Sequence, residues 1–560
     1  MSNPPLRRST RAGSAKPEGA PVARAAPLPV ANGKHAATKP TKSSGRIASQ
    51  PTKRPTSPTS SPPKKRSRSA APQSDTEDAK KSSLRKTSSG RRLARKPTAN
   101  GLPAVAEEPQ QLKPYFNPIP SPPSPRRPAA QLFVWGAGNF GQFGMGPDFL
   151  GEFPSPKRNT WVDQKISEGT FGSEGAGLEA IAAGGLHTLF VDEKGAVWSC
   201  GVNDDAALGR VTKDVPDPKN PGSFMDIDTL TAIPHPIQSL SDEKFRAVQI
   251  TAGDSISAAV SVDGELRVWG SFRAAEGSLG FSSAAQHEFF PRKILELTHK
   301  PGDIEKVVSV VAGNNHLVVL TTHGNVFTWG TGEHGQLGRK IIDRRKIHGT
   351  VPEKIALGHR SNRAVVIGAG NYCSFAVDEA GDVWGWGLNT MGQTGTGVLE
   401  RGSTSDAIHT PRKVYSLCKS AMNGEVVVQI AGGEHHTLFL TSLGRVFACG
   451  RCDGGQLGLA EDDPTYKSRP NPDFVAEPLE VVFDEPSDPI VSIASGTHNN
   501  MAITRAGVLY AWGQESQGEL GVKEVEAKTP TVVVRREGSF EAVAVACGGQ
   551  HTLGLFKKKA

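Results

Sequence analysis

Residues 183–201 read AGGLHTLFVDEKGAVWSCG and contain the pattern on which the fold prediction depends. A small residue and two glycines come shortly before His187, and an apolar run follows. A turn containing Gly195 leads to a second apolar run, which ends in the step Cys200-Gly201. Two apolar runs joined by a short glycine turn are typical of a β-hairpin. The segment therefore predicts two adjacent antiparallel strands.

The same pattern recurs along the chain after residue 131. Trp-Gly or Cys-Gly steps end apolar runs at Gly136, Gly201, Gly270, Gly330, Gly387, Gly450 and Gly513. Motifs that begin with a small residue and glycine start near Ala183, Ala252, Ala312, Ala369, Ala431, Ser495 and Cys547. Each series has seven members, and the steps lie 57 to 69 residues apart. Such spacing indicates a repeat architecture of short strands.

The two series are out of phase at the ends of the chain. The step at Gly136 has no preceding small-Gly motif, and the motif at Cys547 has no following step. Pairing the last strands with the first would close a ring and remove exposed sheet edges, whereas a solenoid would need capping repeats. We predict an all-β fold over residues 131–560: a seven-bladed β-propeller closed by its N- and C-terminal strands, with tryptophans packed between blades.

Residues 1–130 have a different composition, rich in Pro, Ser, Ala, Lys and Arg. They contain 26 Lys and Arg against 6 Asp and Glu, while the rest of the chain contains 39 and 50. A segment with so few apolar residues does not bury enough surface to offset the entropy of ordering. We predict a disordered basic tail that binds DNA or nucleosomes through phosphate contacts, ahead of an acidic domain.

The tail also contains a candidate import signal. Lys64, Lys65, Arg66 and Arg68 follow two prolines and resemble a nuclear-import sequence. The alternative is a generic solvated basic run. The signal predicts a nuclear-import receptor as a partner and a nuclear, chromatin-associated location.

Enzyme motifs are missing or incomplete. Cys449 and Cys452 form a CxxC pair without the further ligands that a zinc site needs. The GxGxxG strings at residues 136–141 and 330–335 lie in register with the β repeat and do not open a helix, as a dinucleotide site would require. No apolar run is long enough to span a membrane. We expect no covalent chemistry, no cofactor, no metal and no membrane partner.

The repeat resembles that of the regulator of chromosome condensation family, over about residues 131–556. Residues 203–210 and 252–273 are similar to the Ran exchange factors of that family. The resemblance implies a guanine-nucleotide exchange factor for the small GTPase Ran that acts on chromatin as a monomer and supports nucleocytoplasmic transport and mitotic control. The alternative is a chromatin or scaffold propeller without exchange activity.

One repeat departs from the common spacing. From the Gly step to the second glycine of the next turn is 8 residues in six repeats and 10 residues in the segment 270–280. Surface insertions are often tolerated without function, but loops also carry most binding residues. The resemblance implies a β-wedge at this position. The residues predicted to act on the GTPase are Asp254, Phe272, Arg273, Ala274, Ala275, Glu276, Gly277 and Ser278.

Histidine recurs at four of the seven equivalent positions, at His187, His316, His435 and His551. A recurring residue is more often structural than functional, but the resemblance implies that His435 and His551 face Ran. Asn139 and Asn315 stand where animal relatives carry acidic residues, so an ion pair at these two positions would be lost. The predicted partner-binding residues are Asn139, Asn315, Arg339, His435, Arg451 and His551.

Overall fold

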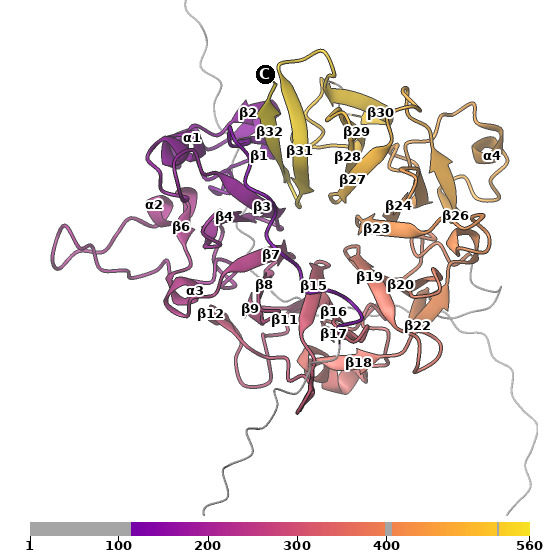
Figure 1. Cartoon of the computed structure of the whole chain (residues 1–560), viewed down its shortest axis with the longest axis horizontal. Coiled ribbons are helices and arrows are strands. Elements are labelled where there is room, and N and C mark those ends of the chain that lie inside the picture. Colours follow the sequence, from indigo (N-terminus) through magenta and orange to yellow (C-terminus); the bar gives the residue numbers. More distant parts are fainter. Residues whose placement is uncertain (1–113, 398–405, 524–525, 560) are drawn as a thin grey trace, which may run out of the picture. The chain divides into compact units, whose positions relative to one another are not determined.

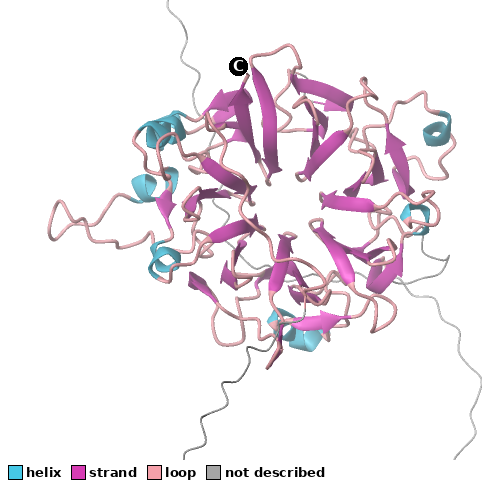
Figure 2. Cartoon of the chain, in the orientation of Figure 1, coloured by secondary structure: helices cyan, strands magenta, loops and turns pink. Residues whose placement is uncertain are grey.

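The computed structural model describes residues 114–397, 406–523 and 526–559. The short strands of these residues surround a central space (Figure 1), and the helices lie outside the strands (Figure 2). The predicted import residues Lys64, Lys65, Arg66 and Arg68 lie outside the described residues. None of the helices in the described ranges is long and apolar enough to cross a membrane.

The first strand of each repeat lies nearest the central space (Figure 1) and ends at the small-Gly motif. These inner strands are β3 (Leu178–Ala183), β7 (Ala247–Ala252), β15 (Val307–Ala312), β19 (Ala364–Ala369), β23 (Val427–Gly432), β27 (Ile490–Ser495) and β31 (Phe540–Cys547).

The second strand follows the motif and pairs antiparallel with the first. These strands are β4 (His187–Asp192), β8 (Ile256–Ser261), β16 (His316–Thr321), β20 (Cys373–Asp378), β24 (His436–Thr441), β28 (Asn499–Thr504) and β32 (His551–Lys558). Their first six residues are buried throughout, because side chains pack on both faces of each sheet. Burial on both faces explains why their sequences are continuous runs instead of alternating patterns.

The third strand ends at or just after the Gly step, and the fourth lies at the outer edge (Figure 1). The third strands are β1 (Gln131–Ala137), β5 (Val197–Gly201), β9 (Leu266–Gly270), β17 (Val326–Gly330), β21 (Val383–Leu388), β25 (Val446–Arg451) and β29 (Leu509–Gln514). The fourth strands are β2 (Glu152–Arg158), β6 (His235–Pro236), β12 (Glu288–Arg292), β18 (Glu353–Ile355), β22 (Ala407–Lys413), β26 (Phe474–Val481) and β30 (Glu526–Val534).

The remaining elements are short. Two small hairpins are β10 (Arg273–Ala274) with β11 (Gly277–Ser278) and β13 (His299–Lys300) with β14 (Asp303–Ile304). The helices are α1 (Thr160–Ser167), α2 (Ile227–Ala232), α3 (Gln238–Asp242), α4 (Pro464–Lys467) and the 3₁₀ turns η1 (Pro147–Phe149), η2 (Asp343–Thr350) and η3 (Tyr415–Leu417).

The two ends of the propeller sequence share one sheet. Its strand order is β2-β1-β32-β31, and β1 pairs with β32 from Gln131 opposite Phe556 to Gly136 opposite His551. Gly136 has a φ of 91°, and a Cβ there would lie 2.6 Å from the carbonyl oxygen of Gln550. The Gly step is therefore required both by the backbone conformation and by the close approach of the next strand.

Tryptophans near the Gly steps connect neighbouring repeats. The buried indole N–H of Trp269 donates to the carbonyl of Ala207 at 2.8 Å, in the loop of the preceding repeat. Trp386 makes the equivalent bond to Gln336 at 2.9 Å. These bonds satisfy the polar atom of an otherwise apolar ring. The predicted packing of tryptophan between repeats is confirmed at both positions.

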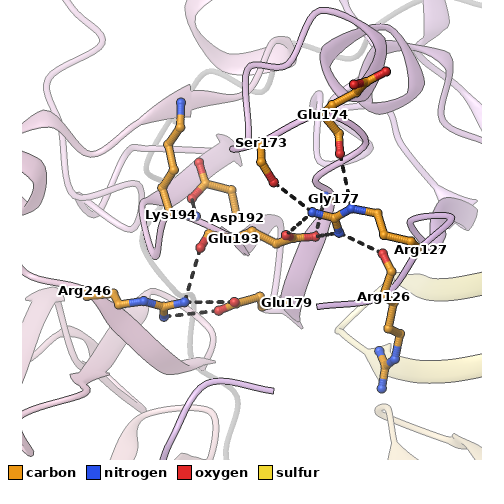
Figure 3. A network of polar contacts seen from close by, with 10 residues as sticks. All are labelled: Arg126, Arg127, Ser173, Glu174, Gly177, Glu179, Asp192, Glu193, Lys194 and Arg246. Atoms are coloured by element: carbon orange, nitrogen blue, oxygen red, sulfur yellow. Dashed lines mark hydrogen bonds and ion pairs between the residues drawn. The ribbon is translucent and has the colours of Figure 1, made fainter. Parts of the chain in front are cut away.

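Residues 114–130 pack against the sheets, so the predicted start of the folded domain at residue 131 needs correction. The buried Asn117 side chain donates hydrogen bonds to the carbonyls of Thr321 at 3.1 Å and Ala364 at 2.9 Å. Arg127 forms an ion pair with Glu193 at 2.8 Å (Figure 3). These contacts offset the entropy of ordering an apolar-poor segment. The contacts of Asn117 and Arg127 lie at or next to the turns that join second strands to third strands. These turns are at the opposite ends of the strands from the Gly steps.

Candidate partner-binding surface

The loop that is two residues longer than its equivalents forms a β-hairpin between β9 and β12. Arg273 pairs with Ser278, and Ala274 pairs with Gly277. The turn carries Glu276, whose side chain is 73% exposed. The hairpin begins at the strand ends that carry the Gly steps. We call residues 273–278 the wedge.

Phe272 belongs to the core and not to the exposed wedge. Its side chain is 0% exposed and packs in a buried cluster with Ile256 and Trp329. Its carbonyl accepts hydrogen bonds from the backbone N–H groups of Leu279 at 2.9 Å and Gly280 at 3.1 Å. The prediction that Phe272 acts directly on a partner is therefore wrong, and the ring instead anchors the base of the hairpin.

Asp254 lies beside the base of the wedge, in the loop between β7 and β8. Its backbone N–H donates to the carbonyl of Asn314 at 2.7 Å, and its side chain is 37% exposed. The guanidinium of Arg273 lies 4.0 Å from the Asp254 carboxylate and 3.8 Å from that of Asp205. Burial raises the pKa of Asp254, while Arg273 opposes that shift and Asp205 adds to it. A half-exposed carboxylate therefore stands next to a cation of the wedge.

Asp205 is a member of this cluster that the sequence did not single out. Its carboxylate accepts a hydrogen bond from the Ser255 hydroxyl at 3.1 Å and lies 3.6 Å from Nδ1 of His287. It stands within residues 203–210, which carry part of the family resemblance. Its acidic type was visible there, but only the fold places it against Arg273, 68 positions later in the chain.

The loops next to the wedge surround the mouth of a central cavity of about 390 Å³. Asp254 and Glu434 both line this cavity. Burial raises the pKa of Tyr372, the Asn314 side chain opposes that shift, and Glu434 and Asp254 add to it. The mouth therefore presents two carboxylates, which favour a basic partner surface.

In one repeat the strand pairing is shifted by one residue from the predicted register, at the neighbouring residues His435 and His436. His436 lies opposite Gly450 in the pairing of β24 with β25, as His187 lies opposite Gly201 in the pairing of β4 with β5. His436 is therefore the repeat histidine, and the assignment of His435 to that position is wrong. The first strand of this repeat ends at Gly432 instead of at an alanine, so the motif begins one residue later than its letters indicate.

The repeat histidines are buried and hydrogen-bonded. Nε2 of His436 lies 2.8 Å from Oδ1 of Asn500, and Nε2 of His551 lies 2.8 Å from Oγ1 of Thr188. Burial lowers the pKa of His436 to about 4 and that of His551 to about 3. His551 is 0% exposed, so the prediction that its ring faces a partner is wrong. Its position at the β1–β32 pairing makes it part of the core.

His435, in contrast, lies at the surface of the loops. Its ring nitrogen Nδ1 is 3.3 Å from the Gln393 amide nitrogen, and Nε2 is 3.9 Å from the Glu434 carboxylate. His498 lies 3.5 Å from the same carboxylate. Burial lowers the pKa of His435, although Glu434 opposes the shift. The side chain is 22% exposed, so part of the ring can be reached from solvent beside an acidic group.

The two predicted asparagines have different roles in the structure. Asn139 is exposed in the loop after β1. Asn315 is half-buried, and its side-chain oxygen accepts a hydrogen bond from the backbone N–H of Arg273 at 2.8 Å. Asn315 therefore supports the base of the wedge through an interaction that needs no charge.

The two predicted arginines also differ. Arg451 is 34% exposed and pairs with Asp453 at 2.6 Å. Arg339 is 14% exposed, and its guanidinium donates to the carbonyls of Gly349 and Val351 at 3.2 and 2.8 Å. The prediction that Arg339 binds a partner needs correction, because its guanidinium is hydrogen-bonded to the loop around η2.

Comparison with known proteins places this chain in a family. The RCC1-like domain profile matches residues 131–554. The chain belongs to the RCC1-like domain family. Among its RCC1-like relatives, Protein pim1 of Schizosaccharomyces pombe is 30% identical over 470 residues, covering 83% of this chain and 80% of that protein. Guanine nucleotide exchange factor SRM1 of Saccharomyces cerevisiae is 31% identical over 444 residues, covering 75% and 86%.

Solved RCC1-like structures agree with this assignment. Prp20p of S. cerevisiae, described by its binding properties to Gsp1p and histones, has a TM-score of 0.65 and 27% identity, covering 78% of this chain and 93% of that one. Yeast RCC1 (Prp20) in complex with Kap60 gives a TM-score of 0.65 at 26% identity, covering 84% and 97%. This chain therefore has the all-β, RCC1-like propeller fold.

Proposed function

We propose that this chain is a guanine-nucleotide exchange factor for the small GTPase Ran. The observation that carries the proposal is the wedge, an exposed hairpin in the repeat with the longer loop, standing beside the half-exposed Asp254. It occurs in a family in which one relative is named a guanine nucleotide exchange factor and another is described by its binding to Gsp1p.

The mechanism requires binding energy and no bond chemistry. A protein that binds the nucleotide-free GTPase more tightly than the nucleotide complex must weaken nucleotide binding by the same free energy. The acidic loops around Asp254 and Glu434 supply a surface for a basic partner, and the wedge supplies a projection that competes with the bound nucleotide. Several contacts must share this work, because one exposed ion pair contributes only about 1 kcal/mol or less.

The basic tail supports a location on chromatin in the nucleus. Residues 1–130 carry 26 basic and 6 acidic side chains, and one relative, yeast Prp20, is described by its binding to histones and as bound to Kap60. We infer that the tail binds nucleosomal DNA and that Lys64, Lys65, Arg66 and Arg68 bind an import receptor. Nuclear accumulation that survives replacement of these four residues by alanine would contradict the import role.

We also infer that the repeats form seven blades of one closed ring. The two motif series each have seven members, and β1 and β32 share a sheet. The strands β19 to β22 and β23 to β26 form two four-stranded sets of one continuous sheet, and the two sets meet at a parallel bridge between Ala369 and Ala431. Removing β1 tests closure. A closed ring should lose its cooperative unfolding without this strand, whereas an open array of sheets should keep it.

Release of labelled GDP from purified Ran, with and without the full chain, tests the exchange function. We expect rapid release with the wild-type chain and much slower release with Asp254→Asn, which retains the size of the side chain and removes its charge. Wild-type protein that binds nucleosomes but leaves the release rate unchanged would support the alternative of a chromatin or scaffold propeller.

A further inference from the structure

The wedge has little support of its own. It consists of two two-residue strands, and an isolated hairpin of this kind is at best marginally stable in water. A Cβ placed on Gly277 would meet no heavy atom within 4 Å, so this side of the hairpin is open. A hairpin that must press on a partner in a defined direction therefore needs contacts from a neighbouring element.

The next repeat supplies these contacts to the wedge backbone. The side-chain oxygen of Asn315 accepts a hydrogen bond from the N–H of Arg273 at 2.8 Å, and the hydroxyl of Thr331 donates to the Arg273 carbonyl at 2.7 Å. Closer to the turn, Oε2 of Glu333 accepts from the N–H of Ala275 at 2.9 Å. The Glu333 side chain is only 15% exposed and is paired with Lys346 at 2.6 Å.

Lys346 connects this support to the tip of the wedge. It lies in η2, and its ammonium group is 2.6 Å from Oε1 of Glu333 and 2.6 and 2.7 Å from the two oxygens of Glu276. Hydrogen bonds to Glu276 and then Glu333 raise the pKa of Lys346, because both carboxylates favour its charged form. One lysine thus joins the turn of the wedge to the carboxylate that holds its backbone.

We propose that Glu333 and Lys346 are positioning residues that fix the wedge in the orientation needed for nucleotide exchange. The inference rests on the proposed exchange function. Glu333 holds the wedge backbone directly, while Lys346 holds Glu333 and the Glu276 side chain together. Replacing Glu333 should therefore slow nucleotide exchange more than replacing Lys346. A small misplacement of a group that acts on a bound partner is costly, since about 1 Å can reduce a rate 100-fold.

Hydrogen–deuterium exchange in the full chain tests the contact without reference to activity. In Glu333→Ala, the amide of Ala275 loses its acceptor, and we expect its exchange to accelerate about 10-fold, the equivalent of one hydrogen bond. The amide of Arg273 keeps its bond to Asn315 and serves as the internal control. Glu333→Gln retains an acceptor oxygen and is expected to restore protection.

Labelled-GDP release from Ran then tests the role in exchange. We expect Glu333→Ala to lower kcat between about 10-fold and 100-fold with KM nearly unchanged, because it misplaces the wedge without removing the acidic surface. Lys346→Met should have a smaller effect, and Lys346→Arg should retain most activity. Lys413→Met is the matched control, since Lys413 is similarly exposed and pairs with Asp382 away from the wedge.

The outcomes of these experiments separate the positioning role of Glu333 and Lys346 from the exchange function itself. Unchanged protection of Ala275 in Glu333→Ala, or lost protection with unchanged kcat, would overturn the positioning role. A fall in melting temperature that accounts for the loss of activity would also overturn it. Wild-type protein without exchange activity, combined with Glu333-dependent protection of Ala275, would instead overturn the exchange function and leave the contact standing.

Discussion

The loops at the Gly-step ends of the strands and the buried strands beside them place neighbouring residues in opposite environments. His435 lies at the surface beside Glu434, whereas the adjacent His436 is buried against Asn500. Phe272 is buried, whereas the adjacent Arg273 is 53% exposed. In both pairs the boundary of a strand falls between two neighbours. Buried and solvent-accessible side chains therefore alternate within one position at the strand ends, and for the two histidines residue type alone does not tell which of them is buried.

Removing β1 is the strongest test of this division. Deletion of residues 1–137 removes Trp135 from the core and unpairs both β2 and β32. We expect no cooperative thermal unfolding in the truncated protein, measured by calorimetry. Deletion of residues 1–113 is the control and should leave the melting temperature unchanged. A cooperative transition at the wild-type temperature after the longer deletion would show that the sheets do not depend on closure.

Acid should weaken the strands through their buried histidines. Burial lowers the pKa to about 4 for His187, His316 and His436 and to about 3 for His551, against about 6.5 in an unfolded chain. Below pH 6.5 the unfolded state therefore binds protons that the folded state does not, and stability falls as pH falls toward 4. Each histidine contributes up to about 1.4 kcal/mol per pH unit.

Urea unfolding at pH 7 and pH 5 measures this loss. Replacing His187 by Gln should reduce the pH dependence, because one buried titrating group is removed. Equal free energies of unfolding at the two pH values would mean that the buried rings accept protons without cost, against the burial seen here.

Shortening the wedge tests whether the exposed loops serve exchange without contributing to stability. Deletion of Ala274 and Ala275 should slow nucleotide release from Ran about 100-fold while the melting temperature stays the same, because the hairpin lies outside the core. Phe272→Ala is the contrasting variant one residue before the wedge, and it should cost about 3 to 5 kcal/mol of stability. Full exchange activity in the shortened protein would remove the wedge from the mechanism.

The smallest expected effects come from the two neighbouring histidines. His436→Ala leaves the buried Asn500 side chain without one partner and should cost about 1 to 3 kcal/mol of unfolding free energy. His435→Ala should leave stability unchanged and weaken Ran binding several-fold, measured by titration with nucleotide-free Ran. If the two variants changed stability alike, the register that separates them would be wrong.

Much of the fold can be predicted from local sequence because each repeat encodes a hairpin in adjacent residues. The small-Gly motif, the turn and the Gly step all lie within about twenty positions, as in residues 183–201. Counting alone also locates the longer loop at residues 270–280, and the family resemblance identifies it with a wedge. Asp254 stands out because it lies where two other repeats carry Gly185 and Gly549.

Composition and short-range periodicity are enough to predict the strands, their repetition, the out-of-phase ends, the long loop and the basic charge of residues 1–130. Folding alone buries Phe272 and His551, ties Arg339 to its own loop and joins residues 114–130 to the domain. It alone brings Asp205, Glu333 and Lys346 to the wedge. These contacts join neighbouring repeats. Which side chains meet there depends on the packing between sheets and cannot be derived from the order of residues along one strand.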